Sequence, residues 1–238
     1  MKLDILAIGA HPDDVELGCG ATIAKEIRSG KNVGILDLTQ GELGTRGSAE
    51  IRMKEAIAAA KILGISVREN LKFKDAFFVN DESHQLEVIK ILRKYQPDVV
   101  LCNAVTDRHI DHGKGSTLVS DACFLSGLRK IKTELDRVEQ EVWRPKRVYH
   151  YIQWQPIEPD FVVNVSGFVE IKLEAVKAYS SQFYDPNSKE PVSPISSKNF
   201  LDSVAYRARD LGRLVGVDAA EGFTVERYAA VNSLDDLI

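Results

Sequence analysis

The sequence contains little cysteine and no long hydrophobic run. Its three cysteines, Cys19, Cys102 and Cys123, form no Cys-x-x-Cys pair. A count this sparse and odd indicates a reducing compartment and argues against a disulfide framework. No segment approaches the ~18 apolar residues that span a bilayer, and the N-terminal stretch MKLDILAIGAHPDD is not typical of a signal peptide. We therefore expect a cytoplasmic protein with no membrane partner.

A surplus of basic residues is also missing. The 35 acidic residues outnumber the 31 basic ones, so the formal net charge is −4. Nucleic-acid-binding domains usually carry a basic excess, so we expect no nucleic-acid partner. Hydrophobic residues make up 44% and charged residues 28% of the 238-residue chain. This composition is typical of a globular protein, and the length suits a single domain over residues 1–238.

Apolar runs alternate with helical patterns along the chain. The alternation predicts an α/β fold, with a Rossmann-like, doubly wound, mostly parallel sheet and helices on both faces. The expected strands are Leu3–Ala10, Val33–Thr39, Asn70–Phe73, Asp98–Cys102, Arg147–Ile152, Asp160–Val165 and Phe223–Tyr228. The expected helices are Ala21–Ser29, Ala49–Leu63, Glu82–Tyr95, His112–Ser126, Phe168–Tyr179 and Leu201–Val215. The charged stretch Lys130–Glu141 is interpreted as a solvated helix face or a mobile connection, and Ser180–Ser197 as a long loop.

Ionisable side chains follow the first predicted strand, in the sequence His11-Pro12-Asp13-Asp14. His11 and Asp14 stand three residues apart and can converge on one point, as a metal ion requires. A simpler interpretation is also open. Proline suits the first turn of a helix, and acidic residues there interact favourably with the helix dipole. Asp13 and Asp14 could therefore mark only a helix start.

A second cluster follows the fourth predicted strand, from Asp107 to His112, and includes His109 and Asp111. Ligands of open α/β sheets bind beyond the carboxyl ends of the strands, where the strand order reverses. If the first and fourth strands are neighbours, as in a 3-2-1-4 order, the two clusters face each other. They then offer histidine, aspartate and histidine with an open fourth position, which is the stoichiometry of catalytic zinc. Nitrogen and oxygen donors suit Zn²⁺, with Fe²⁺ or Co²⁺ as alternatives.

The two clusters resemble the signatures of the PIG-L/LmbE-like zinc deacetylase superfamily, as AHPDD and HIDH. Other segments are most similar to the branch that makes bacillithiol, namely Thr39–Gly47, Glu50–Ile65, Pro97–Asn103 and Arg144–Tyr151. Enzymes of that branch remove acetate from N-acetylglucosaminyl-malate. The resemblance therefore implies a small N-acetylated amino-sugar substrate and a homo-oligomer, in this branch a hexamer.

The resemblance also implies roles for individual residues. One zinc ion per chain would be held by His11, Asp14 and His112. Asp13 matches the general base that takes a proton from the attacking water. His109 matches the histidine that, when protonated, supports the oxyanion.

Two further residues match positions of the family signatures. Asp111 is the acidic partner inside the second motif. It could keep His109 charged, or it could orient His112 as a partner behind the metal. Arg52 matches the arginine that holds sugar hydroxyls.

A malyl aglycone carries two carboxylates, which arginine binds well in a bidentate manner. Arg46, Arg52 and Arg108 lie in or near the loops at the expected edge of the sheet. Glu42 could accept hydrogen bonds from sugar hydroxyls, and Tyr184 could line the pocket. Each of these side chains could equally be an ordinary surface or loop residue.

Three other classes of protein are weighed against a deacetylase. The first strand-to-helix turn, GAHPDDVELGCG, lacks the GxGxxG pattern of dinucleotide-binding proteins, and its adjacent carboxylates would repel a pyrophosphate. A two-metal phosphoesterase would need a further bridging carboxylate, for which Asp13 and Asp107 are the candidates. A non-catalytic sugar- or metal-binding module has no need of an unliganded base such as Asp13.

Overall fold

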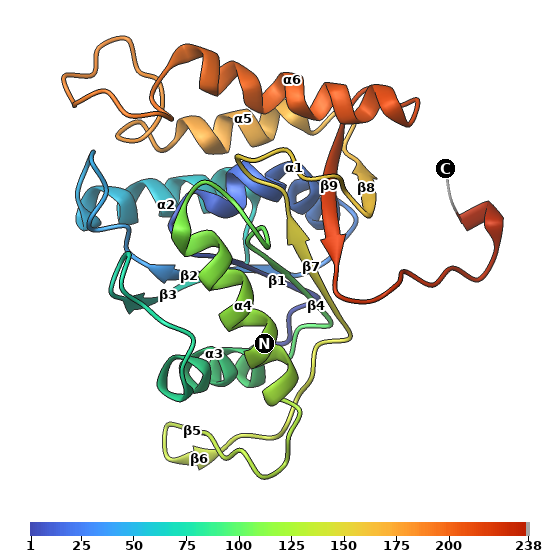
Figure 1. The fold of residues 1–238 in the computed structure, drawn as a ribbon. Helices are drawn as coiled ribbons and strands as arrows, with labels where there is room; N and C mark the ends of the chain where they lie inside the picture. Colours follow the sequence, from blue (N-terminus) through green and yellow to red (C-terminus); the bar gives the residue numbers. More distant parts are fainter. Residues whose placement is uncertain (237–238) are drawn as a thin grey trace.

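The computed structural model describes residues 1–236 (Figure 1). Its strands are β1 (Ile5–Gly9), β2 (Val33–Thr39), β3 (Val67–Phe73), β4 (Val99–Cys102), β5 (Glu134–Leu135), β6 (Val138–Glu139), β7 (Arg147–Tyr151), β8 (Phe161–Asn164) and β9 (Ala220–Val225). Its helices are α1 (Asp14–Arg28), α2 (Ala49–Leu63), α3 (Glu82–Tyr95), α4 (Ile110–Leu125), α5 (Val169–Lys177), α6 (Lys198–Leu214) and the 3₁₀ helix η1 (Leu234–Asp236). Within the described residues, no helix combines the length and apolarity that crossing a membrane requires.

Seven strands form one mixed sheet in the order β3-β2-β1-β4-β7-β9-β8. The first five strands of that order are parallel, and β9 runs antiparallel to both β7 and β8. The predicted α/β class and the predicted 3-2-1-4 order are therefore confirmed. Because β1 and β4 are parallel neighbours, the loops that leave their carboxyl ends start side by side.

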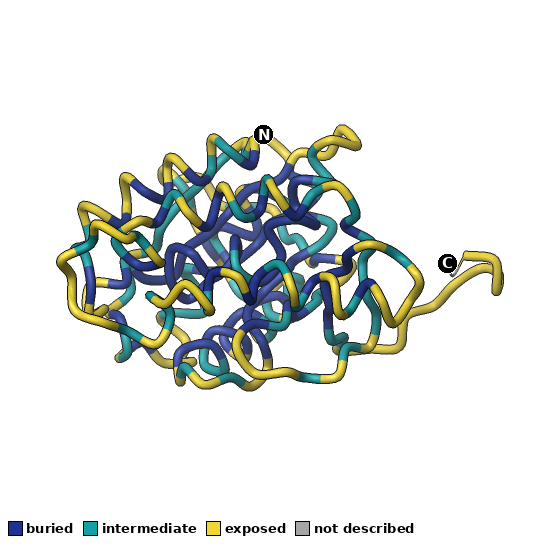
Figure 2. The backbone as a smooth tube through the Cα atoms, turned by 90° about the horizontal axis from the view of Figure 1, so that it is seen from above, coloured by how far each residue is buried: buried dark blue, intermediate teal, exposed yellow. Residues whose placement is uncertain are grey.

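The central strands are apolar throughout because both faces of the sheet are covered. Along β1, Leu6 and Ile8 pack on the side of α3 and α4, whereas Ile5 and Ala7 pack on the side of α1. Successive side chains of a strand point to opposite faces, so a strand buried on both faces needs a continuous apolar run. Helix α5 covers α1 and α2, and α6 lies outside α5 (Figure 1). Figure 2 shows the buried backbone gathered at the centre and the exposed backbone around it.

Helix α1 begins at Asp14, earlier than the Ala21 start predicted from the glycines before it. Gly18 lies inside this helix because of packing. A Cβ there would lie 2.1 Å from Cδ2 of Tyr151, so only glycine lets the helix approach that ring. The backbone at Cys19 is non-helical, with φ −143°, and the helix bends at this point. The glycines therefore mark a close approach and a kink within the helix and not a segment before it.

The interpretation of Lys130–Glu141 as a helix face is wrong, because this segment contains the antiparallel hairpin β5–β6. Asp136 and Arg137 join its strands with φ values of 53° and 66°. Two successive residues with positive φ are the mark of a tight hairpin turn. Solvated charges look alike on a helix and on a hairpin, so composition did not separate the two. The last strand also lies earlier than predicted, at Ala220–Val225, whereas residues 180–197 form the expected long loop.

Candidate active site

The first cluster forms the turn between β1 and α1. Asp13 sits there with φ 114°, in a left-handed region that strains any residue except glycine. It occupies the N-cap position of α1, yet within the described chain its side chain caps no backbone N–H. The carboxyl turns instead toward Arg52, whose Nη2 lies 2.9 Å from Asp13 Oδ2. The interpretation of Asp13 as a mere helix start is therefore wrong.

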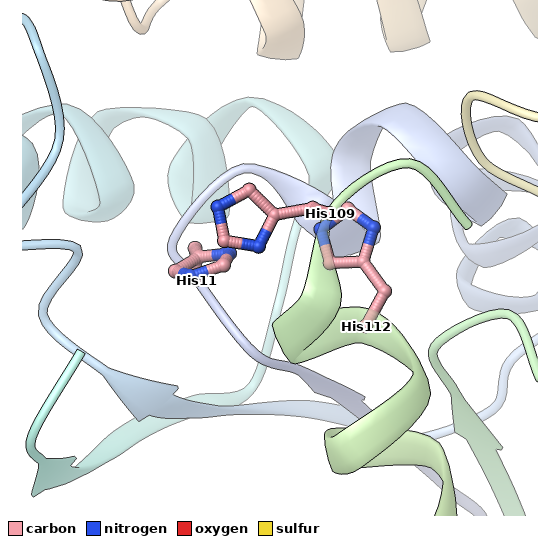
Figure 3. Close-up of side chains that lie close together, drawn as sticks. All are labelled: His11, His109 and His112. Carbon is pink, nitrogen blue, oxygen red and sulfur yellow. The ribbon is translucent and has the colours of Figure 1, made fainter. Parts of the chain in front are cut away.

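The second cluster forms the start of α4, directly beyond β4. His109 is the N-cap residue of this helix, and its Nδ1 accepts the backbone N–H of Asp111 at 3.3 Å. The ring centroid of His109 lies 4.6 Å from that of His11 and 5.2 Å from that of His112. Figure 3 shows the three rings gathered between the turn after β1 and the first turn of α4. The neighbouring strands thus bring the two predicted clusters together.

Asp14 lies between two of these imidazoles. Its Oδ2 is 3.5 Å from Nδ1 of His11, and its Oδ1 is 3.1 Å from Nε2 of His112. The remaining ring nitrogens face other carboxylates: Nδ1 of His112 lies 2.5 Å from Asp107, and Nε2 of His11 lies 3.1 Å from Asp75. A metal-binding histidine commonly gives its second nitrogen to a carboxylate, which fixes the ring and its tautomer. The donor set therefore fits a divalent cation held by His11, Asp14 and His112.

A different grouping, His11, His109 and His112, brings one nitrogen from each ring within 4.8 Å of the others. His109 fits this set less well than Asp14 does. Since Nδ1 of His109 accepts a hydrogen bond from Asp111, a neutral ring carries its proton on Nε2. A protonated nitrogen donates a hydrogen bond and does not bind a cation. His109 therefore faces the site as a donor.

The Asp111 carboxylate does not contact the imidazole rings expected for it, although the backbone N–H of Asp111 donates to His109. Its carboxylate accepts the backbone N–H of Ala76 at 2.8 Å and the Lys114 ammonium at 3.2 Å, and lies 3.4 Å from Nε2 of His11. The alternative that it orients His112 is therefore wrong, whereas its charge does raise the pKa of His109, as the other alternative expected, without contacting that ring. It backs His11, and Asp107 is the partner of His112.

Asp75, which also contacts His11, was not predicted from the sequence, and neither was the position of Asp107 behind His112. Asp75 comes two residues after the end of β3, at the same edge of the sheet as the two clusters. That position could have indicated a site residue, because the carboxyl ends of parallel strands lie at one edge of the sheet. Asp107 was visible as part of the second cluster, but its direction depends on the loop backbone.

The pKa of the Asp13 carboxyl lies near neutral pH. Burial raises its pKa to about 7, against the opposing effect of the Arg52 guanidinium. Arg52 also donates to the carbonyl oxygens of Pro12 and Gly41. The arginine thereby holds the carboxyl in place. A buried carboxyl with a pKa near the working pH can accept a proton and later return it.

The surroundings of His109 oppose the positive charge that was expected on its ring. Burial lowers the pKa of His109, and the neighbouring His11 and His112 lower it further. The Asp111 charge acts in the other direction but is the smaller influence. The Nε2 proton of neutral His109 still provides a hydrogen bond for an oxygen atom that gains negative charge.

A cavity of about 360 Å³ opens onto these groups and is also lined by Arg46, Arg52 and Arg108. The guanidinium of Arg46 is hydrogen-bonded to other residues of the chain. It donates to the carbonyl oxygens of Gln182 at 3.3 Å and of Phe183, and to the Ser188 hydroxyl. Arg46 therefore anchors the long loop 180–197 against the site.

Tyr184 does not line this cavity, so that prediction is wrong, and Glu42 is not among the lining residues either. Glu42 Oε1 accepts the backbone N–H of Asp75 at 2.8 Å and so fixes the loop that carries Asp75. Tyr184 lies in a separate groove with Tyr206 and Arg209 of α6.

Residues 6–123 match the PIG-L family, which is described as GlcNAc-PI de-N-acetylase. The chain belongs to the PIG-L family. The matched segment contains both histidine–aspartate clusters as well as Arg52 and Asp75. The family resemblance stated from the two motifs is therefore confirmed.

Among solved structures, the conserved protein TT1542 from Thermus thermophilus superposes on this PIG-L chain with a TM-score of 0.84 and 37% identity, over 97% of this chain and 98% of that one. A diacetylchitobiose deacetylase from Thermococcus kodakarensis is 29% identical over 194 residues, 75% of this chain and 70% of the relative. A 4-oxalmesaconate hydratase from Pseudomonas putida is 25% identical over 194 residues, 74% of this chain and 73% of the relative. Because the relatives differ in reaction, the activity has to be argued from the site.

Proposed function

We propose that this protein is a metal-dependent N-deacetylase that hydrolyses the acetamide of an N-acetylglucosamine conjugate. The observation that carries the proposal is Asp13, a buried carboxyl with a pKa near 7, placed beside the group His11, Asp14 and His112. Membership of the PIG-L family and the deacetylase relative support the same reaction. The substrate we infer is N-acetylglucosaminyl-malate, which places the enzyme in bacillithiol biosynthesis.

We infer Zn²⁺ as the metal, held by His11, Asp14 and His112, with Fe²⁺ or Co²⁺ as alternatives for the same donors. When bound, such a metal activates water for attack at neutral pH and polarises the acetyl carbonyl. Asp107 behind His112 and Asp75 behind His11 keep the two rings in the orientation that binding needs.

The chain supplies the proton transfers. Asp13 accepts a proton from the attacking water as the C–O bond forms, and it returns that proton to the amine nitrogen as the C–N bond breaks. Arg52 holds the Asp13 carboxyl throughout. His109 donates its Nε2 proton in a hydrogen bond to the former carbonyl oxygen, where negative charge develops.

A two-metal phosphoesterase fits the site less well. A second set of possible ligands exists, because His11, Asp75 and Asp111 bring their atoms within 4.8 Å of one another. Both carboxylates are already engaged, Asp75 by the backbone N–H of Leu43 and Asp111 by that of Ala76. These hydrogen bonds favour a supporting role behind His11.

The test combines metal analysis of the purified protein with product assays. We expect one zinc per chain, release of acetate from N-acetylglucosaminyl-malate, and much slower release from free N-acetylglucosamine. Comparable turnover of the two would contradict the malate-conjugate assignment but keep the deacetylase. Phosphate release from phosphoesters, or hydration of 4-oxalmesaconate, without any acetate release would contradict the deacetylase itself.

A further inference from the structure

The cavity extends beyond the catalytic group into a second arm beneath α6. We use the term α6 arm for the part lined by Trp154, Phe200, Val204, Arg207 and Leu211. In Figure 1, α6 lies on the outer side of α5. Most of this lining is apolar, and few charged side chains lie near it.

The acidic groups near the α6 arm are already engaged. Glu221 accepts the backbone N–H groups of Ala21 and Thr22 at the kink of α1, and Lys172 Nζ lies 2.6 Å from its Oε1. Glu221 and Lys172 therefore cancel each other. Asp107 faces His112 and also accepts the backbone N–H of Gln155 at 2.7 Å. Neither carboxylate forms an ion pair with an arginine of the arm.

Arg207 is the group without a counterpart. It is half-buried on α6 and lines the cavity, and within residues 1–236 its guanidinium makes no hydrogen bond and no ion pair. Burial lowers the pKa of Arg207, and the negative charge of Asp107 offsets this in part. Removing a cation from water without a partner is unfavourable, so the position suits a guanidinium that receives an anion from outside the chain.

Arg108 stands at the mouth of the same arm. Its guanidinium carbon lies 4.7 Å from the centre of the Trp154 ring, which stacks on Phe200 at 5.3 Å between centroids. Contact with an aromatic face positions the guanidinium while leaving its N–H groups available. The two arginines thus give the α6 arm a positive charge that the neighbouring acids do not cancel.

We propose that Arg207 and Arg108 bind a carboxylate on the aglycone of the substrate, so that the α6 arm selects anionic conjugates of N-acetylglucosamine. The guanidinium group matches a carboxylate in geometry, and such charge-assisted bonds are about twice as strong as neutral ones. This inference rests on the proposed function, since it assigns the part of the substrate that the catalytic group does not touch. Arg46 and Arg52, by contrast, are engaged within the chain.

The test compares Arg207→Gln with Arg209→Gln, a matched change at an exposed position of the same helix. The substrates are N-acetylglucosaminyl-malate and the neutral methyl glycoside of N-acetylglucosamine. In Arg207→Gln, we expect the ratio of kcat/KM for the anionic substrate to that for the neutral one to fall roughly 10- to 100-fold, mainly through KM. Arg207→Lys should recover part of the ratio, and Arg209→Gln should keep it. An unchanged ratio in Arg207→Gln, or an equal fall in Arg209→Gln, would overturn the proposal.

A binding measurement separates this inference from the proposed reaction. Calorimetry of wild type and Arg207→Gln with the deacetylated glucosaminyl-malate needs no turnover. We expect wild type to bind it at least tenfold more tightly than Arg207→Gln does. If wild type releases no acetate but shows this difference, the deacetylase proposal fails and the anion site stands. If acetate is released but the two proteins bind the ligand equally, the anion site fails alone.

Discussion

At the scale of single residues, the two adjacent aspartates of the first motif contact different partners because the backbone turns between them. Asp13 adopts φ 114° and points to Arg52, whereas Asp14 is the first residue of α1 and faces two imidazoles. A strained backbone that the surrounding structure maintains is typical of functional sites. The division of roles between the two carboxylates follows from this turn.

Replacing Asp13 tests that division. We expect Asp13→Asn to lower acetate release about 10²- to 10⁴-fold, because the amide cannot accept the proton, while the metal content stays that of wild type. The matched change Asp14→Asn should reduce the metal content itself. Acetate assays and metal analysis of both purified variants measure this. Loss of metal from Asp13→Asn would contradict the assignment.

Asp107 provides a second test at this scale, because its Oδ2 lies against Nδ1 of His112, while its Oδ1 accepts the backbone N–H of Gln155. We expect Asp107→Asn to weaken zinc binding about 10- to 100-fold, since the His112 ring loses the carboxylate that orients it. Competition with a chelator of known affinity measures the change. Asp121→Asn, a change on the exposed surface of α4, serves as the control. Equal affinities in the two variants would mean that Asp107 does not act through His112.

At the scale of elements, helix α3 is capped by a charged side chain. Asp81 begins α3 by accepting the backbone N–H of His84 at 2.9 Å, and it also lies 2.7 Å from the His84 ring. The backbone N–H and then the ring of His84 hold the pKa of Asp81 well below its usual range. Its charge therefore stabilises the folded state wherever the carboxyl is ionised.

The pH dependence of this cap follows from the sign of the shift. Because the folded pKa is lowered, the stabilisation is complete above the unfolded pKa of about 3.9 and is lost as the pH falls below it. We expect Asp81→Ala to lower the Tm at pH 7 and the gap to wild type to narrow as the pH falls from 4 to 2. Asp81→Asn keeps a capping oxygen and should show a smaller gap at pH 7. A gap that is constant from pH 7 to pH 2 would rule out the ionised cap.

Helices and strands could be predicted from the sequence where their burial requires apolar side chains at regular positions. The apolar runs of β1 and β2 are required by a sheet covered on both faces, and the clusters directly beyond β1 and β4 located the site. The hairpin β5–β6 was missed because its few ladder contacts leave no apolar pattern. The contacts of Asp111 and Tyr184 were also missed, because the partners lie far away in the sequence: the Asp111 carboxylate accepts from Ala76, and Tyr184 lies with residues of α6.

At the scale of the whole molecule, the proposed metal ligands come from two separate parts of the chain. His11 and Asp14 follow β1, and His112 lies on α4, so an ion bound by all three would link the turn after β1 to α4. We expect removal of the metal with a chelator to lower the Tm by roughly 10 °C, because saturating binding contributes about 4 kcal/mol at a thousand times Kd. Added zinc should restore the Tm of wild type but not that of Asp14→Asn. An unchanged Tm after verified metal loss would contradict binding by this group.

The cavity is assembled from two distant stretches of sequence. The proposed catalytic groups lie within residues 6–123, whereas α6 and its Arg207 come near the end of the described chain. Mutation can therefore reshape the preference for a conjugate in one stretch without disturbing the cleavage machinery in the other. With this separation, substrate preference can change during evolution while the catalytic residues stay the same.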